Sequence, residues 1–193
     1  MLPSHHHAVQ FYGNESQLFT TVSGFLSEGL ISGHPALVVA TRAHREGILD
    51  AMRGRFVDVS RAQHAGDLTL LDAQEVLSSL MTGPNGRPDR ERFEVLVGLA
   101  IDRASQGRAL VTVRAYGEMV DVLWKEGQTD AALALEALWN DISRRRRLAL
   151  LCGYSVGNFT TQVEQFQSIC EHHTHVIGPD AELTTPYRRA DVR

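Results

Sequence analysis

Three polar side chains that could take part in chemistry follow one apolar segment in the middle of the chain. Residues 109–113 are five apolar or β-branched residues in a row, which is typical of a strand buried on both faces. Arg114, Tyr116 and Glu118 follow at once. Because ligands of open parallel sheets bind just beyond the carboxyl ends of the strands, these three residues are predicted to lie at a ligand site.

Arg114 and Glu118 allow two interpretations, because a buried charge is costly unless it is paired. In the first, they form an internal salt bridge beside a packed Tyr116. In the second, Arg114 anchors an anion or a carbonyl group, and Glu118 orients it or accepts a hydrogen bond from the ligand. Both interpretations hold together if Arg114 and Glu118 are already paired in the free protein. Glu118 could also act as a general base, but no nucleophile or metal ligand stands near it in the sequence. We therefore expect ligand binding without catalysis.

Polar residues at the ends of other predicted strands are expected along the same edge of the sheet. Tyr12 and Tyr154 carry amphipathic rings that could wall a small pocket, so both are further candidate ligand-binding residues. Thr41 and Asp72 each precede a predicted helix, and we expect them to cap these helices. Cys152 lies on a predicted buried strand and is interpreted as a small core residue.

Residues of the types that bind metals cluster at both ends of the chain, as His5, His6 and His7 and later as Cys170, His172, His173 and His175. In the second group, Cys170 and His173 would share a helix face. Two ligands do not complete a structural zinc site, which normally has four. Imidazoles that pack at the helix end are the alternative. We therefore expect that folding requires no metal ion and that the protein has no cofactor.

These candidate residues must be positioned by strands and helices that alternate along the chain. Besides residues 109–113, the predicted strands are short apolar runs, at Ala8–Tyr12, Ala36–Thr41, Leu68–Asp72 and Leu148–Cys152, with a weak strand or turn at Val57–Val59. Between them, apolar residues recur at helical spacing; Asn14 is typical of a cap before the first helix, and Gly33 of its end. This alternation predicts an α/β three-layer sandwich with a mainly parallel central sheet.

A nucleotide-binding version of this fold needs a phosphate loop and a nearby acidic strand end. The turn at residues 11–16 reads FYGNES, with one glycine, no lysine and an added carboxylate. Arg114 stands where an acidic residue would hold magnesium. The chain therefore lacks Walker A and Walker B residues, which argues against a diverged ATPase or phosphotransferase.

The composition is that of one ordinary globular domain. The 193 residues are 43% hydrophobic and 22% charged, and the net charge of -4 does not favour direct binding to nucleic acid or to an anionic membrane. Two cysteines make no disulfide framework, the first residues lack a signal-peptide pattern, and no apolar run is long enough to span a bilayer. We expect a cytoplasmic protein, with one domain over residues 1–178 and a polar, flexible tail over residues 179–193.

Several motifs in order make the chain similar to the MEDS family over His7–Val176. They are HAVQFYGNES, GFLSEGLISGHPALVVATRAHREGI, GDLTLLDAQEVL, VRAYGEMVDVLWKEG and LLCGY. The family is a sensory domain in regulators of methanogens and methylotrophs, including a dichloromethane-responsive repressor. The resemblance implies a RecA/KaiC-like layout without the phosphate loop, and a role in sensing small organic molecules.

MEDS domains often precede histidine-kinase or DNA-binding domains, and we expect no such domain to accompany this one. The resemblance therefore implies a histidine kinase or transcription regulator as a separate partner, with a homodimer as a further candidate assembly. The expected function is a non-enzymatic sensory module in which a small organic ligand contacts Arg114, Tyr116 and Glu118 and shifts a short helix at residues 120–126. A protein-interaction module without a ligand is the alternative.

Overall fold

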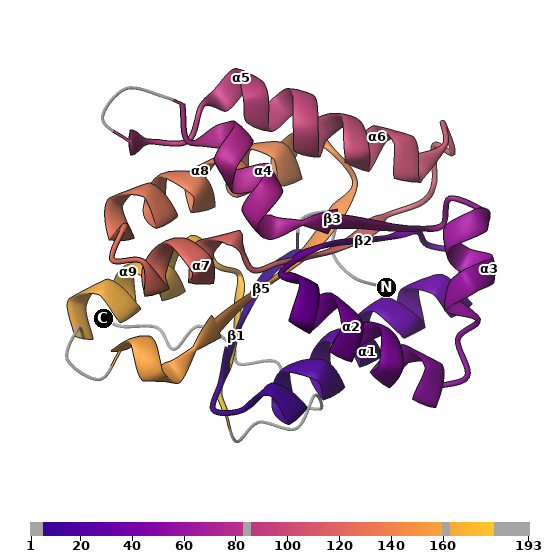
Figure 1. Cartoon of the computed structure of the whole chain (residues 1–193). Coiled ribbons are helices and arrows are strands. Elements are labelled where there is room, and N and C mark those ends of the chain that lie inside the picture. The colour runs from indigo at the N-terminus through magenta and orange to yellow at the C-terminus, as the bar shows by residue number, and fades with distance from the viewer. Residues whose placement is uncertain (1–5, 83–85, 160–162, 180–193) are drawn as a thin grey trace.

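The computed structural model describes residues 6–82, 86–159 and 163–179. Its centre is a sheet of six parallel strands in the spatial order β3-β2-β4-β5-β1-β6, with helices on both faces (Figure 1). The prediction of an α/β three-layer sandwich with a parallel central sheet is confirmed. The strands are β1 (His6–Tyr12), β2 (Ala36–Ala40), β3 (Leu68–Asp72), β4 (Val113–Gly117), β5 (Leu148–Ser155) and β6 (His175–Ile177).

The helices divide between the two faces of the sheet. One face packs against α1 (Glu15–Ile31), α2 (Arg42–Gly54) and α3 (Val59–His64). The other face packs against α4 (Ala73–Leu80), α5 (Arg90–Phe93), the π-helical turn η2 (Glu94–Gly98), α6 (Leu99–Ser105), α7 (Met119–Lys125), α8 (Thr129–Arg145) and α9 (Val163–His172). A short 3-10 helix, η3 (Val156–Phe159), follows β5. Two apolar cores result, one on each side of the sheet.

Local sequence signals set both ends of α1 and the start of α4 as predicted. The Asn14 side chain caps α1 by accepting a hydrogen bond from the Gln17 N–H at 3.0 Å. After α1, Gly33 adopts a φ of 77°, a left-handed conformation that costs glycine little. Asp72 caps α4 by accepting hydrogen bonds from the N–H groups of Gln74 and Glu75.

The strand predicted over residues 109–113 is displaced in the structure. β4 begins only at Val113, because its neighbours β5 and β2 begin at the same level of the sheet, at Leu148 and Ala36. The residues before Val113 therefore have no strand beside them to pair with. As a consequence, Arg114 is the second residue of β4 and lies at the amino end of the sheet.

Two other predicted boundaries also move. Val57–Val59, predicted as a weak strand or turn, is the entry to α3, which Asp58 caps by accepting a hydrogen bond from the Arg61 N–H. β5 runs beyond its predicted end to Ser155, so Tyr154 belongs to the strand. The predicted tail over residues 179–193 lies, after its first residue, outside the described part of the chain.

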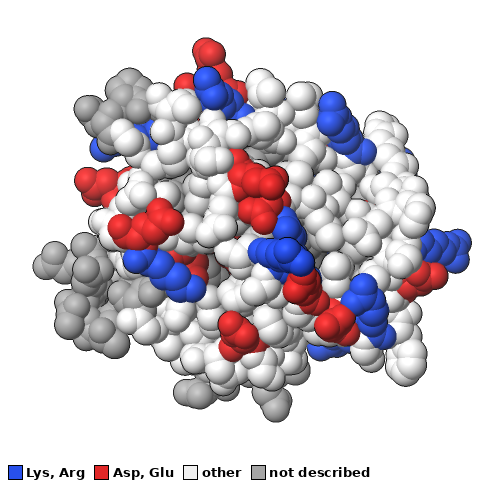
Figure 2. All heavy atoms as spheres, in the orientation of Figure 1, with Lys and Arg blue, Asp and Glu red and all other residues white. Residues whose placement is uncertain are grey.

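Within the described residues, none of the helices combines the length and the apolar character that crossing a bilayer requires. On the face shown in Figure 2, acidic and basic side chains are interspersed, and neither sign gathers into one broad patch.

Candidate functional site

A network of buried polar side chains surrounds Glu118 at the carboxyl edge of the sheet. Glu118 follows β4, directly precedes α7 and is 2% exposed. Its Oε1 accepts a hydrogen bond from the Thr41 backbone N–H at 2.5 Å. Its Oε2 lies 2.5 Å from His44 Nδ1 and accepts a hydrogen bond from the Tyr116 hydroxyl at 3.1 Å. Both carboxylate oxygens therefore have donors, two of which come from the start of α2.

Asp121, one turn further along α7, forms the second half of this network. Its Oδ2 accepts a hydrogen bond from the Tyr12 hydroxyl at 3.1 Å and lies 2.7 Å from the Lys125 ammonium. Its Oδ1 accepts a hydrogen bond from the Ser155 N–H at 3.0 Å. Because both carboxylates are paired, their burial is compensated. We call this set the edge network; it joins the ends of β1, β2, β4 and β5 to α2 and α7.

The electrostatics of the edge network favour a protonated histidine and neutral tyrosines. The hydrogen bond to Glu118 raises the pKa of His44, although burial acts in the opposite direction. His44 Nε2 also lies 3.6 Å from a Glu15 carboxylate oxygen. Burial raises the pKa of Tyr12 and of Tyr116 well above the ordinary tyrosine value, and nearby carboxylates add to both shifts. Both hydroxyls therefore remain donors at neutral pH.

The structure brings together three of the five predicted ligand-binding residues, Tyr12, Tyr116 and Glu118. Tyr116 is fully buried and packs in the core beneath α1, and Tyr12 is 5% exposed. Gly153 on β5 leaves room for the Tyr116 hydroxyl, since a Cβ there would lie 2.7 Å from that oxygen. Ligand binding by these three residues stays a prediction.

Arg114 does not belong to the edge network, so the interpretation of Arg114 and Glu118 as an internal salt bridge is wrong. The Arg114 Nη1 donates hydrogen bonds to Glu28 Oε2 at 2.8 Å and to the Phe25 carbonyl at 2.7 Å, both on α1. The reason is strand register, which places Arg114 at the amino end of β4 and Glu118 beyond its carboxyl end. Gly29 on α1 leaves space for the Arg114 stem, because a Cβ there would lie 2.5 Å from the Arg114 Cδ.

The remaining predicted edge residues have different surroundings. Tyr154 points to the opposite face of the sheet, where its hydroxyl donates a hydrogen bond to Glu136 Oε1 at 2.8 Å. Thr41 precedes α2, but its side chain makes no capping hydrogen bond, so the prediction of a side-chain cap is wrong. Its backbone N–H serves Glu118 instead. Asp72 caps α4 as predicted.

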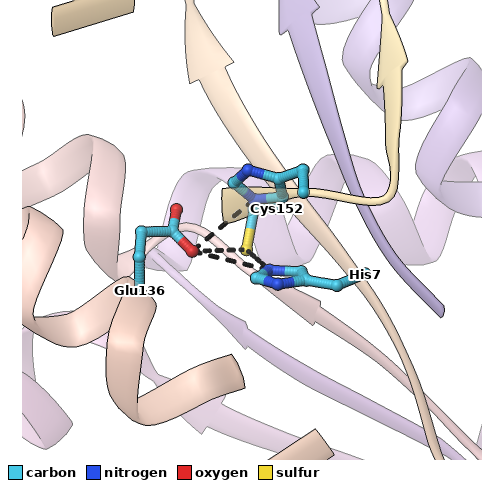
Figure 3. Close-up of side chains that lie close together, drawn as sticks. His7, Glu136 and Cys152 are labelled. Atoms are coloured by element: carbon cyan, nitrogen blue, oxygen red, sulfur yellow. Dashed lines mark hydrogen bonds and ion pairs between the residues drawn. The ribbon is translucent and has the colours of Figure 1, made fainter. Parts of the chain in front are cut away.

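A second group of buried polar side chains lies on that opposite face, and we call it the histidine–cysteine cluster. It consists of His7 on β1, Glu136 on α8, Cys152 on β5 and His173 just after α9. Figure 3 shows Glu136 reaching from its helix toward His7 and Cys152. His7 Nε2 lies 3.2 Å from Cys152 Sγ and 3.5 Å from Glu136 Oε2. His173 Nε2 lies 3.5 Å from the same oxygen, and Cys152 Sγ lies 3.9 Å from it.

Burial dominates the electrostatics of this cluster. Burial raises the pKa of Glu136 and of the Cys152 thiol, and it lowers the pKa of His173 to about 4. The positive charge of a protonated His7 would lower the pKa of Glu136. In the absence of a bound cation, the neutral forms of these groups are therefore favoured.

Several residues of these two sites were not predicted from the sequence, among them His44, Asp121 and Glu136. For two of them a signal exists. Asp121 interrupts the apolar residues of α7, and Glu136 stands next to Leu135 on the buried face of α8. A charged residue on a buried helix face needs a partner, and that requirement marks a polar site. His44 has no comparable signal, because it lies in the polar first turn of α2.

An open depression of about 1170 Å³ lies between the segment before α5 and the connection from α7 to α8. It is lined by residues 86–91 and 127–131. None of these residues belongs to the edge network or to the histidine–cysteine cluster, so this depression is not part of either site.

The fold and the edge network define the class of this protein. It is a parallel α/β sandwich that concentrates buried charge at the carboxyl edge of its sheet, where proteins of this architecture bind ligands. Within that class the chain belongs to the MEDS family, the methanogen/methylotroph, DcmR sensory domain, whose family model matches residues 6–174. The resemblance inferred from the sequence motifs is thereby confirmed. No curated protein matches the chain with significant similarity.

Proposed function

We propose that this domain is a non-enzymatic sensory module that binds a small organic ligand at the carboxyl edge of the sheet and signals to a separate protein. The observation that carries the proposal is the placement of two buried, fully paired carboxylates, Glu118 and Asp121, at that edge. Membership of a sensory family supports the sensory part of the role.

The edge network contains hydrogen bonds that a ligand could replace. Glu118 is bound to the start of α2 through His44 and the Thr41 N–H, and it also begins α7. A ligand that hydrogen-bonds to Glu118 in place of these donors would release α2 from α7. Because opening a buried pair costs about 3–5 kcal/mol, such a ligand must supply replacement hydrogen bonds. The difference between the ligand's affinities for the bound and the released arrangement of α2 and α7 then determines how far the ligand shifts the equilibrium between them.

The approach to the network from solvent is charged. Glu15, which faces His44, has a side chain that is 68% exposed, and the Lys125 side chain beside Asp121 is 48% exposed. A small polar organic molecule with one donor and one acceptor matches this surface better than a purely apolar one. The Tyr116 ring is fully buried, so a ligand would affect Tyr116 through the hydrogen bond between its hydroxyl and Glu118.

The proposed recipient of the signal is a histidine kinase or a transcription regulator, and a second copy of the chain is a further candidate partner. The interspersed charges of the surface in Figure 2 support a protein partner over nucleic acid or an anionic membrane. The turn at residues 11–16 lacks a phosphate loop, which favours a sensor over an ATPase.

The test is a titration of the purified chain with dichloromethane and with a series of short-chain alcohols, amines and carboxylic acids. Trp124 lies in α7 and packs edge-on against Tyr154, so its fluorescence reports a shift of that helix. Hydrogen exchange of α2 and α7 provides a second measurement. We expect a saturable change with at least one compound.

Two variants locate the response. Glu118→Gln and Tyr12→Phe should abolish it, whereas Glu94→Gln, an equivalent acid-to-amide change at an acid that pairs with Arg145 and Arg146 outside the edge network, should preserve it. A saturable response that both edge variants retain would contradict the proposed site. Hydrolysis of Mg·ATP by the wild-type chain would favour the ATPase instead, and no response to any compound would favour an interaction module without a ligand.

A further inference from the structure

Four atoms that are typical metal ligands converge in the histidine–cysteine cluster. They are the Nε2 atoms of His7 and His173, Glu136 Oε2 and Cys152 Sγ, and all lie within 4.8 Å of one another. The side chains of His7, His173 and Glu136 have no exposed surface. The ligand atoms come from two adjacent strands, from α8 and from the end of α9, so the fold itself assembles the group.

Hydrogen bonds around the cluster leave both imidazoles with a lone pair that points inward. Asn140 donates its amide N–H to the His172 carbonyl, so its Oδ1 accepts the Nδ1 proton of His7 at 3.0 Å. His173 Nδ1 donates to the Ile169 carbonyl at 2.7 Å. In neutral imidazoles whose Nδ1 carries the proton, Nε2 is an acceptor. Metal-binding histidines are held by an outer hydrogen bond of this kind.

The remaining two groups are held in the same manner. The Tyr154 hydroxyl donates to Glu136 Oε1 at 2.8 Å, which leaves Oε2 facing the two histidines. Cys152 carries a single S–H proton, which can serve one acceptor at a time. When Glu136 is ionised, the cluster thus gathers more acceptors than donors.

His173 Nε2 shows the consequence most directly. It is buried, and no described residue forms a hydrogen bond with it. The nearest charged group is Glu136 Oε2 at 3.5 Å, itself an acceptor when ionised. A buried polar atom without a partner is costly, and native proteins seldom keep one unless a further group satisfies it.

We propose that His7, Glu136, Cys152 and His173 together bind one divalent transition-metal ion, with zinc as the best fit. Thiolate and imidazole ligands select zinc over magnesium and calcium. A tetrahedral site with metal–ligand distances of about 2.0–2.3 Å separates its ligand atoms by about 3.3–3.8 Å. The separations given above, 3.2, 3.5, 3.5 and 3.9 Å, lie close to this range. This proposal departs from the sequence-based expectation that the protein has no metal ion or other cofactor.

Charge balance also fits a divalent ion. One thiolate and one carboxylate supply two negative charges, and two neutral imidazoles supply none, so the loaded site carries no net charge. A neutral site is what a buried position tolerates. Because all four ligands come from the protein, the site is closed, as in structural zinc sites.

The ion would join parts of the fold that are far apart in the sequence. His7 lies on β1, and His173 lies between α9 and β6, which pairs with β1. Metal binding would therefore hold α9 and β6 against α8 and the centre of the sheet. This role is separate from that of the ligand proposed at the edge network, because the two sites share no residue.

The first experiment uses the wild-type chain without a histidine tag. Metal content is measured by mass spectrometry of the elements after purification, and the chain is then stripped with a chelator and titrated with Zn²⁺ and Co²⁺. We expect one ion per chain. The cobalt form should show intense visible bands typical of tetrahedral geometry, together with a thiolate-to-cobalt charge-transfer band in the near ultraviolet.

Matched variants identify the ligands. Cys152→Ser should remove the charge-transfer band, whereas Cys170→Ser, at the other cysteine, should keep it. His173→Gln should abolish one-to-one binding, whereas His172→Gln, at the adjacent histidine, should preserve it. Asn140→Ala, which removes the outer hydrogen bond of His7, should weaken zinc binding about 10–100-fold.

Chelation of the wild-type chain should lower its melting temperature and increase hydrogen exchange in α9 and β6. The proposal is overturned if the wild-type chain takes up no Zn²⁺ or Co²⁺ stoichiometrically, or if bound cobalt shows no thiolate band. It is also overturned if His172→Gln or Cys170→Ser abolishes binding. The wild-type titrations decide the question even where a ligand variant does not fold.

Discussion

His44 Nδ1 lies 2.5 Å from Glu118 Oε2, although the two residues are 74 positions apart. One residue belongs to the first turn of α2 and the other begins α7, on the opposite face of the sheet. This contact is therefore the point at which the two helical layers meet through the end of the sheet. It is also the link on which the proposed signalling depends.

Stability should depend on pH through His44. Its pKa is raised in the folded protein, chiefly by the hydrogen bond to Glu118, with Glu15 adding to the shift and Lys125 opposing it. The pKa of the unfolded side chain is about 6.5. The stabilisation that His44 gives the folded state is therefore fully present below that pH and is lost as pH rises through the folded pKa.

Urea unfolding at several pH values between about 6 and 9 measures this dependence. His44→Asn should flatten the decline of the free energy of unfolding in this range. His64→Asn, at an exposed histidine on α3, should leave the decline unchanged. An identical slope in the wild type and in His44→Asn would show that other groups cause the dependence.

Arg114 should couple energetically to Glu28 and not to Glu118. Arg114→Ala removes a buried stem and the hydrogen bond to the Phe25 carbonyl, so we expect a loss of about 1–3 kcal/mol. Glu28→Gln should cost only about 0–1 kcal/mol, because the Glu28 side chain is 74% exposed. Double-mutant cycles in urea measure both couplings. A coupling between Arg114 and Glu118 larger than that with Glu28 would contradict the observed register.

Gly153→Ala should destabilise the fold by about 1–3 kcal/mol, the usual cost of overpacking a core. Its new Cβ would lie 2.7 Å from the Tyr116 hydroxyl oxygen. Gly157→Ala is the control, since its nearest side-chain atom, Ser155 Oγ, lies at an ordinary 3.6 Å. Adding Tyr116→Phe to Gly153→Ala should recover part of the loss. Thermal unfolding of the wild type, the two glycine variants and this double variant provides the comparison. Equal losses at both glycines would show that the Tyr116 hydroxyl is not the cause.

Phe56→Asn should stabilise the protein by about 0.5–1 kcal/mol. Phe56 adopts a φ of 62° and is 99% exposed, so it has backbone strain without compensating burial. Asparagine tolerates the left-handed conformation better. Ile31→Asn, at a 77% exposed helical residue, should bring no such gain. The change in melting temperature of the two variants tests the difference, and a less stable Phe56→Asn would indicate that the phenyl ring has a contact worth more than the strain.

Much of the architecture could be predicted from the sequence because its signals are local. Apolar runs such as Ala36–Ala40 predict buried parallel strands, and Asn14 and Asp72 cap the helices that follow them. The alternation of these signals predicts the three layers without knowledge of any long-range contact. The family motifs, too, are continuous stretches of sequence.

The composition of the two polar sites depended on contacts between distant residues. Whether Arg114 joins Glu118 was decided by the register of β4 against β2, which the apolar run beginning at Ala109 does not specify. From the sequence, His7 and His173 belonged to separate clusters near the two ends of the chain, Cys152 was interpreted as a core residue, and Glu136 carried no prediction. Only the packing of α8 and α9 over β1 and β5 places their side chains together, because side-chain proximity across a sheet is set by strand order and register and not by spacing along the chain.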